Sequence, residues 1–159
     1  MDTTPSVTGF LAFVRAQMGI STTILPDSST DITDAYNYAI EIVSDSFINL
    51  GGTIYTRAVY NFAGDNLINN AVDQPSATPT SGSIPPPLPY FEDLRRKWQI
   101  NSFVSGVINS SSDESTSQSM VVQKAAEDFQ LGDLQLLKTP YGRAYLAIAQ
   151  KYGPVLGIS

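Results

Sequence analysis

One stretch near the end of the sequence carries clear structural signals at both of its ends, Thr139-Pro-Tyr-Gly-Arg-Ala-Tyr-Leu-Ala-Ile-Ala-Gln-Lys-Tyr-Gly-Pro154. Thr139 can cap the free amides of a first helical turn, and Pro140 suits the first helical position because its missing N–H costs nothing there. Gly153 can take the left-handed conformation that ends a helix, and Pro154 cannot continue it. The stretch therefore predicts a helix with defined limits.

Apolar residues recur in this helix at intervals of three and four, which places them on one face. This stripe consists of Tyr141, Ala144, Tyr145, Ile148 and Tyr152. Tyrosine offers a large contact area with a polar tip, which suits the edge of a core or a protein interface. The core face of an ordinary helix is the favoured interpretation, and an interface is the alternative.

The same spacing predicts two helices in the first part of the chain. The first begins at a cap on Thr4, with Pro5 in its first turn, and ends at Gly19. A polar connector follows, and the second helix runs from about Asp31 to Gly51-Gly52. Asp27, Asp31 and Asp34 lack the spacing of a calcium loop, so helix capping explains them better. The two apolar stripes are Val7, Phe10, Leu11, Val14 and Met18, then Ile32, Tyr36, Ala39, Ile40, Val43 and Phe47.

Residues Thr53 to Ala71 predict a third helix, with a loosening or kink at Gly64-Asp65-Asn66. A strand over Thr53 to Phe62 is the alternative, because the segment is rich in β-branched and aromatic residues. The segment Gln74 to Pro89 is rich in proline, serine and threonine, which predicts an extended loop or arm at about 74–89.

After the arm, Tyr90 to Gln99 predicts a short helix, and a break near Asn101-Ser102 separates it from a second helical stripe ending at Ile108. Residues 109–119 carry Ser, Thr, Asp and Glu and predict a polar loop. Met120-Val121-Val122 either pairs with Val107-Ile108 as a small β-hairpin or, as we prefer, begins a helix that runs through Phe129. Gly132 to Lys138 completes the set as a short helix. The fold class is mainly α: a bundle of short amphipathic helices with a long Pro/Ser-rich arm or loop, in one domain over residues 1–159.

Composition narrows the chemistry. The 159 residues carry a net charge of −6 and contain no cysteine and no histidine. The usual general base and the common transition-metal ligands are therefore missing, and we expect no metal site and no cofactor. The acidic balance argues against a protein that grips nucleic acid by neutralising phosphates. No apolar run is long enough to span a bilayer and no secretory leader is evident, so we expect synthesis in the cytoplasm without membrane attachment.

The remaining candidates for catalysis are carboxylates, lysines and hydroxyls. Adjacent carboxylates occur at Glu92-Asp93, Asp113-Glu114 and Glu127-Asp128, but helix neighbours point about 100° apart and do not converge on a substrate. The phosphate-binding, dinucleotide-binding and nucleophile-elbow motifs do not occur. We expect a protein that is not an enzyme.

Two groups of residues are candidates for a protein interface. The basic triplet Arg95-Arg96-Lys97 lies beside Trp98, and the acidic region from Asp27 to Asp45 offers a complementary charge. A solvated face or an edge that forms salt bridges to an acidic neighbouring subunit explains the triplet better than a nucleic-acid site. The candidate interface residues are Arg95, Arg96, Lys97, Trp98, Tyr141, Tyr145 and Tyr152.

Three segments resemble small proteins from the structural modules of tailed bacteriophages. They are Asp65-Asn66-Leu67-Ile68-Asn69, Tyr90-Phe91-Glu92-Asp93-Leu94-Arg95-Arg96-Lys97 and Leu131-Gly132-Asp133-Leu134-Gln135-Leu136-Leu137-Lys138-Thr139-Pro140-Tyr141-Gly142-Arg143. The first half of the chain, with two amphipathic helices joined by a short polar connector, is similar to the head-to-tail adaptor (head-completion) proteins.

This resemblance implies a mostly helical protomer with an extended arm, located in the virion at the head-tail interface. It implies a homo-oligomeric ring of twelve subunits that binds the portal protein on one side and tail proteins on the other. DNA would pass through the lumen without specific binding. Two alternatives stay open: another phage structural protein, such as a tail-completion or minor head protein, and a non-viral helical adaptor that binds proteins in a groove.

Overall fold

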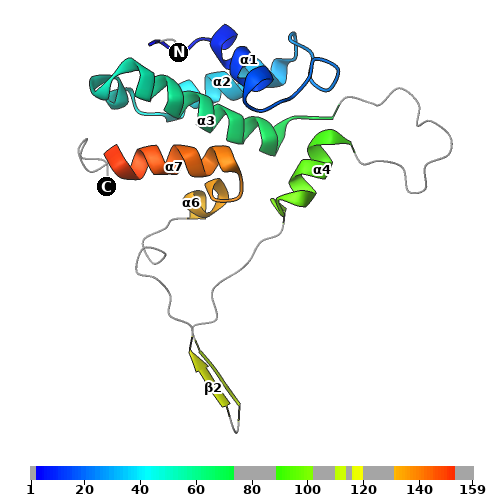
Figure 1. The fold of residues 1–159 in the computed structure, drawn as a ribbon, viewed down its shortest axis with the longest axis vertical. Coiled ribbons are helices and arrows are strands. Elements are labelled where there is room, and N and C mark those ends of the chain that lie inside the picture. Colours follow the sequence, from blue (N-terminus) through cyan, green and yellow to red (C-terminus); the bar gives the residue numbers. More distant parts are fainter. Residues whose placement is uncertain (1–2, 74–88, 102–109, 114–115, 120–130, 153–159) are drawn as a thin grey trace, which may run out of the picture.

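The computed structural model describes residues 3–73, 89–101, 110–113, 116–119 and 131–152. Within these ranges the chain is mainly helical, as the sequence predicts (Figure 1). The elements in chain order are α1 (Val7–Ala16), α2 (Thr30–Ile42), the 3₁₀ helix η1 (Asp45–Leu50), α3 (Gly52–Asn70), α4 (Tyr90–Lys97), β1 (Ser110–Asp113), β2 (Thr116–Ser119), α6 (Leu131–Leu136) and α7 (Pro140–Tyr152).

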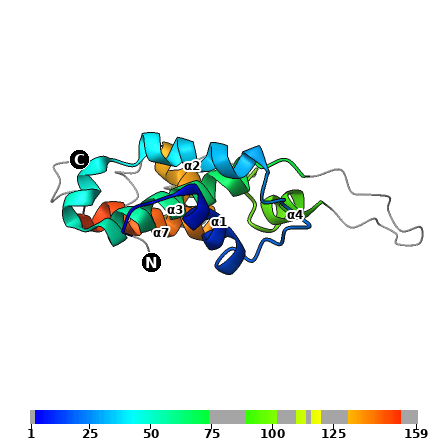
Figure 2. The same ribbon diagram turned by 90° about the horizontal axis from the view of Figure 1, so that it is seen from above.

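Helix α3 is the centre of the bundle. It lies between α1 and α2 on one side and α7 on the other, and the view from above agrees (Figures 1 and 2). A helix covered on several sides buries residues all around its circumference rather than on one stripe. The buried residues of α3 are Tyr55, Thr56, Ala58, Val59, Tyr60, Asn61, Ala63, Gly64, Asp65, Leu67 and Ile68.

The loosening predicted at Gly64-Asp65-Asn66 is wrong, and so is the alternative strand, because α3 continues through both segments as one helix. A Cβ at Gly64 would lie 3.4 Å from a ring carbon of Phe13 and 3.4 Å from one of Tyr141, which is an ordinary contact distance. Residues of α1 and α7 therefore pack over this part of α3, and burial of the helix offsets the poor helix propensity of glycine.

Several helix limits differ from the prediction, and α1 ends at Ala16 rather than Gly19. Helix α1 is capped by Ser6 rather than Thr4, since the Ser6 hydroxyl accepts a hydrogen bond from the Gly9 amide at 3.0 Å. Helix α2 ends at Ile42 instead of continuing to Gly51. The backbone becomes extended at Val43, and Ser44 then caps η1. Apolar Phe47 stays buried in η1, which explains why the helical spacing seemed to continue.

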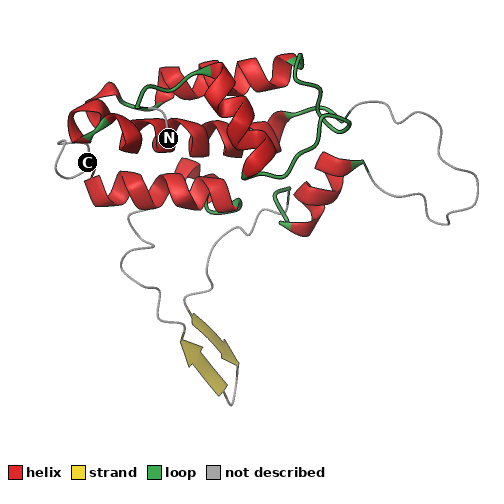
Figure 3. Ribbon diagram, turned by 45° about the horizontal axis from the view of Figure 1, so that its top comes forward, coloured by secondary structure: helices red, strands yellow, loops and turns green. Residues whose placement is uncertain are grey.

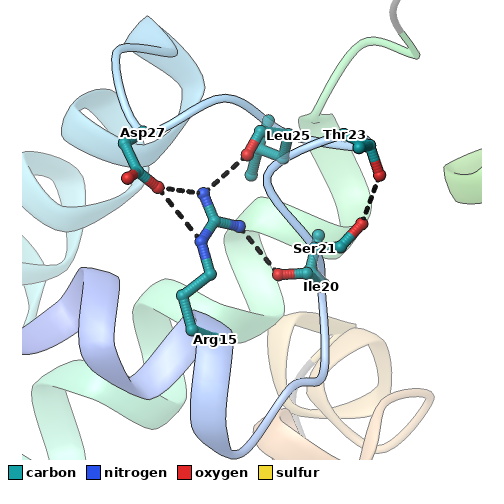
Figure 4. Close-up of polar contacts among 6 residues, drawn as sticks. All are labelled: Arg15, Ile20, Ser21, Thr23, Leu25 and Asp27. Atoms are coloured by element: carbon teal, nitrogen blue, oxygen red, sulfur yellow. Dashed lines mark hydrogen bonds and ion pairs between the residues drawn. The ribbon is translucent and has the colours of Figure 1, made fainter.

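The connector between α1 and α2 contributes to the core through Ile20 and Leu25, which are buried. The guanidinium of Arg15 holds this connector in place (Figure 4). It donates to the carbonyl oxygens of Ile20 at 2.7 Å and Leu25 at 2.6 Å, and it forms an ion pair with Asp27. Asp27 therefore does not cap a helix as predicted, and Ser29 caps α2 by accepting from the Asp31 amide.

Strands β1 and β2 form a small antiparallel hairpin apart from the helices (Figure 3). Ser110 pairs with Ser119 and Asp113 with Thr116, within the stretch where the sequence predicted a polar loop. Backbone pairing needs no apolar side chain, so the polar composition did not exclude strands. Several predictions fall outside the described residues, among them the arm over 74–89 except for Pro89, the stripe through Ile108, the pairing of Val107-Ile108 with Met120–Val122, and the helix through Phe129.

The start of α7 confirms the opening prediction. Pro140 is the first helical residue, and the Thr139 hydroxyl accepts from the Gly142 amide at 2.8 Å. The stripe faces the bundle, where Tyr141, Tyr145, Ile148 and Tyr152 are half-buried against the core. Leu146, outside the predicted stripe, is buried as well. Gly153 and Pro154 lie outside the described residues.

Two buried threonines give a matched pair of substitutions. The Thr56 hydroxyl is buried without a hydrogen-bond partner, whereas the Thr139 hydroxyl both donates and accepts. Thr56→Val should raise the free energy of unfolding by about 1 kcal/mol, because it removes an unpaired buried hydroxyl. Thr139→Val should lower it by about 2–3 kcal/mol, because a cap and a bond to a buried carboxylate are lost. Urea unfolding of the two variants measures both changes, and equal signs would contradict this assignment.

Candidate protein interface

The three residues of the basic triplet predicted from the sequence lie in different environments in the structure. Arg95 faces the bundle, where its Nε donates to the Ile68 carbonyl at 2.8 Å and its terminal nitrogen donates to the Ala71 carbonyl. Its guanidinium also lies 5.9 Å from the centre of the Phe91 ring. A cationic side chain that donates to the last carbonyl groups of a helix satisfies acceptors that have no partner within the helix. Arg95 therefore fastens α4 to the end of α3.

The other members of the triplet lie in different surroundings. Lys97 pairs with Asp93 one turn earlier at 2.6 Å, and this hydrogen bond raises the pKa of Lys97. Arg96 is exposed, and Trp98 is half-buried against the core. An exposed pair of this kind contributes little to stability. The three residues of the triplet thus lie in different surroundings, and they do not form one basic patch.

The beginning of α4 depends on a residue that the sequence analysis did not single out. The carboxylate of Asp73 accepts from the Phe91 amide at 2.8 Å and from the Glu92 amide at 3.0 Å. A carboxylate at a helix N-terminus satisfies free amides and complements the helix dipole. Asp73 was missed because capping rules examine adjacent residues, whereas the arm separates Asp73 from α4.

A buried carboxylate joins α3 to α7. Asp65 is 6% exposed and accepts from the Thr139 hydroxyl on one oxygen and from the Asn69 amide on the other, at 3.0 Å. Burial raises the pKa of Asp65 to about 6, although the hydrogen bonds from Thr139 and Asn69 oppose that rise. Each polar partner holds the carboxylate in a fixed position. This cluster connects two helices.

A groove of about 560 Å³ lies between the first half of α3 and the second half of α7. Arg57 and Lys151 supply two cations at this groove, and Ile54 and Ile148 supply apolar surface. No carboxylate belongs to the lining, which is notable in a chain with a net charge of −6. The lining consists of Gln17, Ile54, Arg57, Asn61, Ala144, Ala147, Ile148, Lys151 and Tyr152.

The three candidate tyrosines separate into three environments. Tyr141 packs edge-on against Phe13, with ring centres 6.0 Å apart, and burial raises its pKa. Tyr145 packs edge-on against Phe62 at 4.9 Å, and Tyr38 of α2 stacks on the same Phe62 at 5.9 Å. Tyr152 lines the groove, with the Lys151 ammonium 5.1 Å from its ring centre. Only Tyr152 of the predicted interface residues therefore lies at the groove.

The other groove residues could not be assigned from the sequence, because three distant parts of the chain supply them. Gln17 and Arg57 are 40 positions apart and Arg57 and Lys151 are 94 positions apart, and no spacing rule joins them. Within the described ranges, no three acidic side chains gather in a way that would hold a metal ion. None of the described helices is long and apolar enough to cross a membrane.

Comparison with known proteins returns no relative: no protein-family model matches the chain, and neither a curated protein nor a solved structure does.

Replacement of Arg95 tests its assignment as a structural residue. Arg95→Met should lower the free energy of unfolding by about 1.5–3 kcal/mol, because the carbonyls of Ile68 and Ala71 lose a charged donor. Arg96→Met is the matched control, since Arg96 is exposed, and should leave stability nearly unchanged. Thermal unfolding of both variants measures the difference. Equal melting temperatures for the two would show that Arg95 does not fasten α4.

The Asp65 carboxyl gives a pH dependence with a defined sign. Its pKa in the folded protein, about 6, lies above the ordinary value of 3.8. Its stabilising contribution is therefore complete below about pH 4 and is lost as the pH rises through about 6. Relative to Asp65→Asn, the parent should lose about 2–3 kcal/mol of unfolding free energy across that interval. Parallel denaturation curves for the two proteins at every pH would contradict this.

Proposed function

We propose that the chain is a structural virion protein, a head-to-tail adaptor that assembles as a ring between the portal and the tail, through which DNA passes. One observation supports this proposal most directly: the three segments that carry the resemblance contact one another. Asp65 of the first segment binds Thr139 of the third, and Arg95 of the second binds the carbonyl of Ile68 in the first. The residues that carry the resemblance therefore belong to one packed unit.

A further contact joins the third segment to the residues that follow the second. The ammonium of Lys138 donates to the Ile100 carbonyl at 2.5 Å, just beyond the end of α4. Three charged residues therefore bind groups within the fold: Asp65, Arg95 and Lys138. A structural subunit needs charged side chains that hold its own segments together in this way. Polar groups held in this way stabilise one arrangement of helices.

The surface of the bundle also suits assembly. A ring with head-to-tail contacts needs two different complementary faces on each protomer. The groove provides one face with cations, and α2 exposes apolar Tyr38 and Ile42 between carboxylates. The acidic net charge agrees with a lumen that lets DNA pass without holding its phosphates.

The groove also supports a second candidate, a helical adaptor that binds a peptide from another protein. Its apolar residues and two cations would accept a short segment with an acidic group. In that case the chain would act as a monomer, and ring formation separates the two functions.

Light scattering and negative-stain microscopy of the purified chain, alone and mixed with the portal protein from the same genome, test this proposal. We expect rings, either free in solution or seated on the portal, with a central channel. A chain that stays monomeric at high concentration and does not bind the portal would contradict the proposed function. Specific binding of a single peptide by that monomer would favour the second candidate.

A further inference from the structure

The groove between α3 and α7 has a charge opposite to that of the whole chain. Arg57 is exposed on α3, and Lys151 is exposed near the end of α7. The neighbouring lining is apolar or amide, and it includes no carboxylate that would neutralise these cations. A surface of this composition favours an occupant with carboxylates placed beside apolar side chains.

Helix α2 presents such a set of side chains on one outer face. The set consists of Asp34, Tyr38, Glu41 and Ile42. Successive members are four, three and one positions apart, so they fall within one side of the helix. All four are exposed, with Tyr38 at 45% and Ile42 at 51%. Exposed apolar residues between carboxylates are typical of an interface that is buried in an assembly. We call these four residues the α2 face.

Asp45 follows the α2 face at the start of η1, but it is engaged within the protomer. Its carboxylate accepts from the Tyr55 hydroxyl at 3.1 Å. Asp34 and Glu41 have no partner of this kind among the described residues. They are therefore the carboxylates that remain for a contact with another molecule.

A protomer cannot fill its groove with its own α2 face. Helix α3 lies between α2 and α7 in Figure 1, and the groove is lined by residues of α3 and α7 together with Gln17, with none from α2. The complementary faces therefore point to different neighbours. Such an arrangement generates a head-to-tail series of subunits, which closes into a ring when the rotation between neighbours permits.

We propose that the groove of each protomer binds the α2 face of a second copy, with Arg57 and Lys151 facing Asp34 and Glu41. This inference rests on the proposed function, since it names the contact that builds the ring. It also revises the sequence-based interface. The acidic region around α2 is kept, while the cations come from α3 and α7 rather than from Arg95, Arg96 and Lys97.

Charge reversal tests the contact. Arg57→Glu with Lys151→Glu in one chain reverses the groove, and Asp34→Lys with Glu41→Lys in another reverses the α2 face. Each reversed chain alone should associate about tenfold more weakly or worse, because like charges then meet. Mixing the two chains should restore assembly, since each groove again meets an α2 face of opposite charge. Sedimentation velocity over a range of concentrations measures all three samples.

Controls separate this contact from folding and from general charge effects. Circular dichroism melting confirms that each variant is folded, and Arg96→Glu serves as the matched exposed substitution away from the groove. Arg96→Glu should assemble like the parent. The association of the parent should also weaken with added salt, because the facing charges are screened.

The possible results distinguish a failure of the groove contact from a failure of the proposed function. If the parent forms rings and the reversed chains form them equally well, the groove contact is wrong and the adaptor function stands. If the reversed groove still allows rings but loses binding to the portal, the portal occupies the groove instead of a second copy. If the parent neither self-associates nor binds the portal, the proposed function itself fails.

Discussion

The bond between Asp65 and Thr139 is the contact on which the rest of the structure depends. The Thr139 hydroxyl donates to a carboxylate buried in the central helix, and the same oxygen accepts from the Gly142 amide at the start of α7. The position of α7 and its helical start are thereby fixed together. Glycine is required at residue 142, because a Cβ there would lie 2.7 Å from the Asp65 carboxylate and 2.1 Å from the Leu136 carbonyl.

Some charged residues of this chain bind groups within the fold, and others face an open surface. Arg15 binds the connector after α1, Arg95 binds the end of α3, and Asp73 binds the start of α4. Each joins one segment of the fold to another. Arg57 and Lys151 are different, because they border an open groove. A charged side chain near an open surface can serve a partner without loss to the fold, which is why we place the assembly contact there.

The sequence predicted the elements whose signals lie in neighbouring residues. Thr139, Pro140 and the tyrosine stripe specify α7 within one short segment, and the structure confirms this helix. Helix α3 was harder, because Gly64 and Asp65 are poor helix formers by local rules, and Asp65 is held there by its bond to Thr139. The roles of Asp73 and Arg95 depend on contacts across the arm. The groove brings together Gln17 after α1 with residues of α3 and α7 that no local pattern relates.

Amide hydrogen exchange of the native protein tests most directly whether Asp65 and Thr139 join α7 to the bundle. If they do, the amides of α7 from Gly142 onward should exchange only through the same opening that exposes the core of α3. The free energies of opening for the two helices should then agree within about 1 kcal/mol. A much lower value for α7 would show that the helix separates from α3 while the rest of the bundle stays folded, and that result would contradict the account.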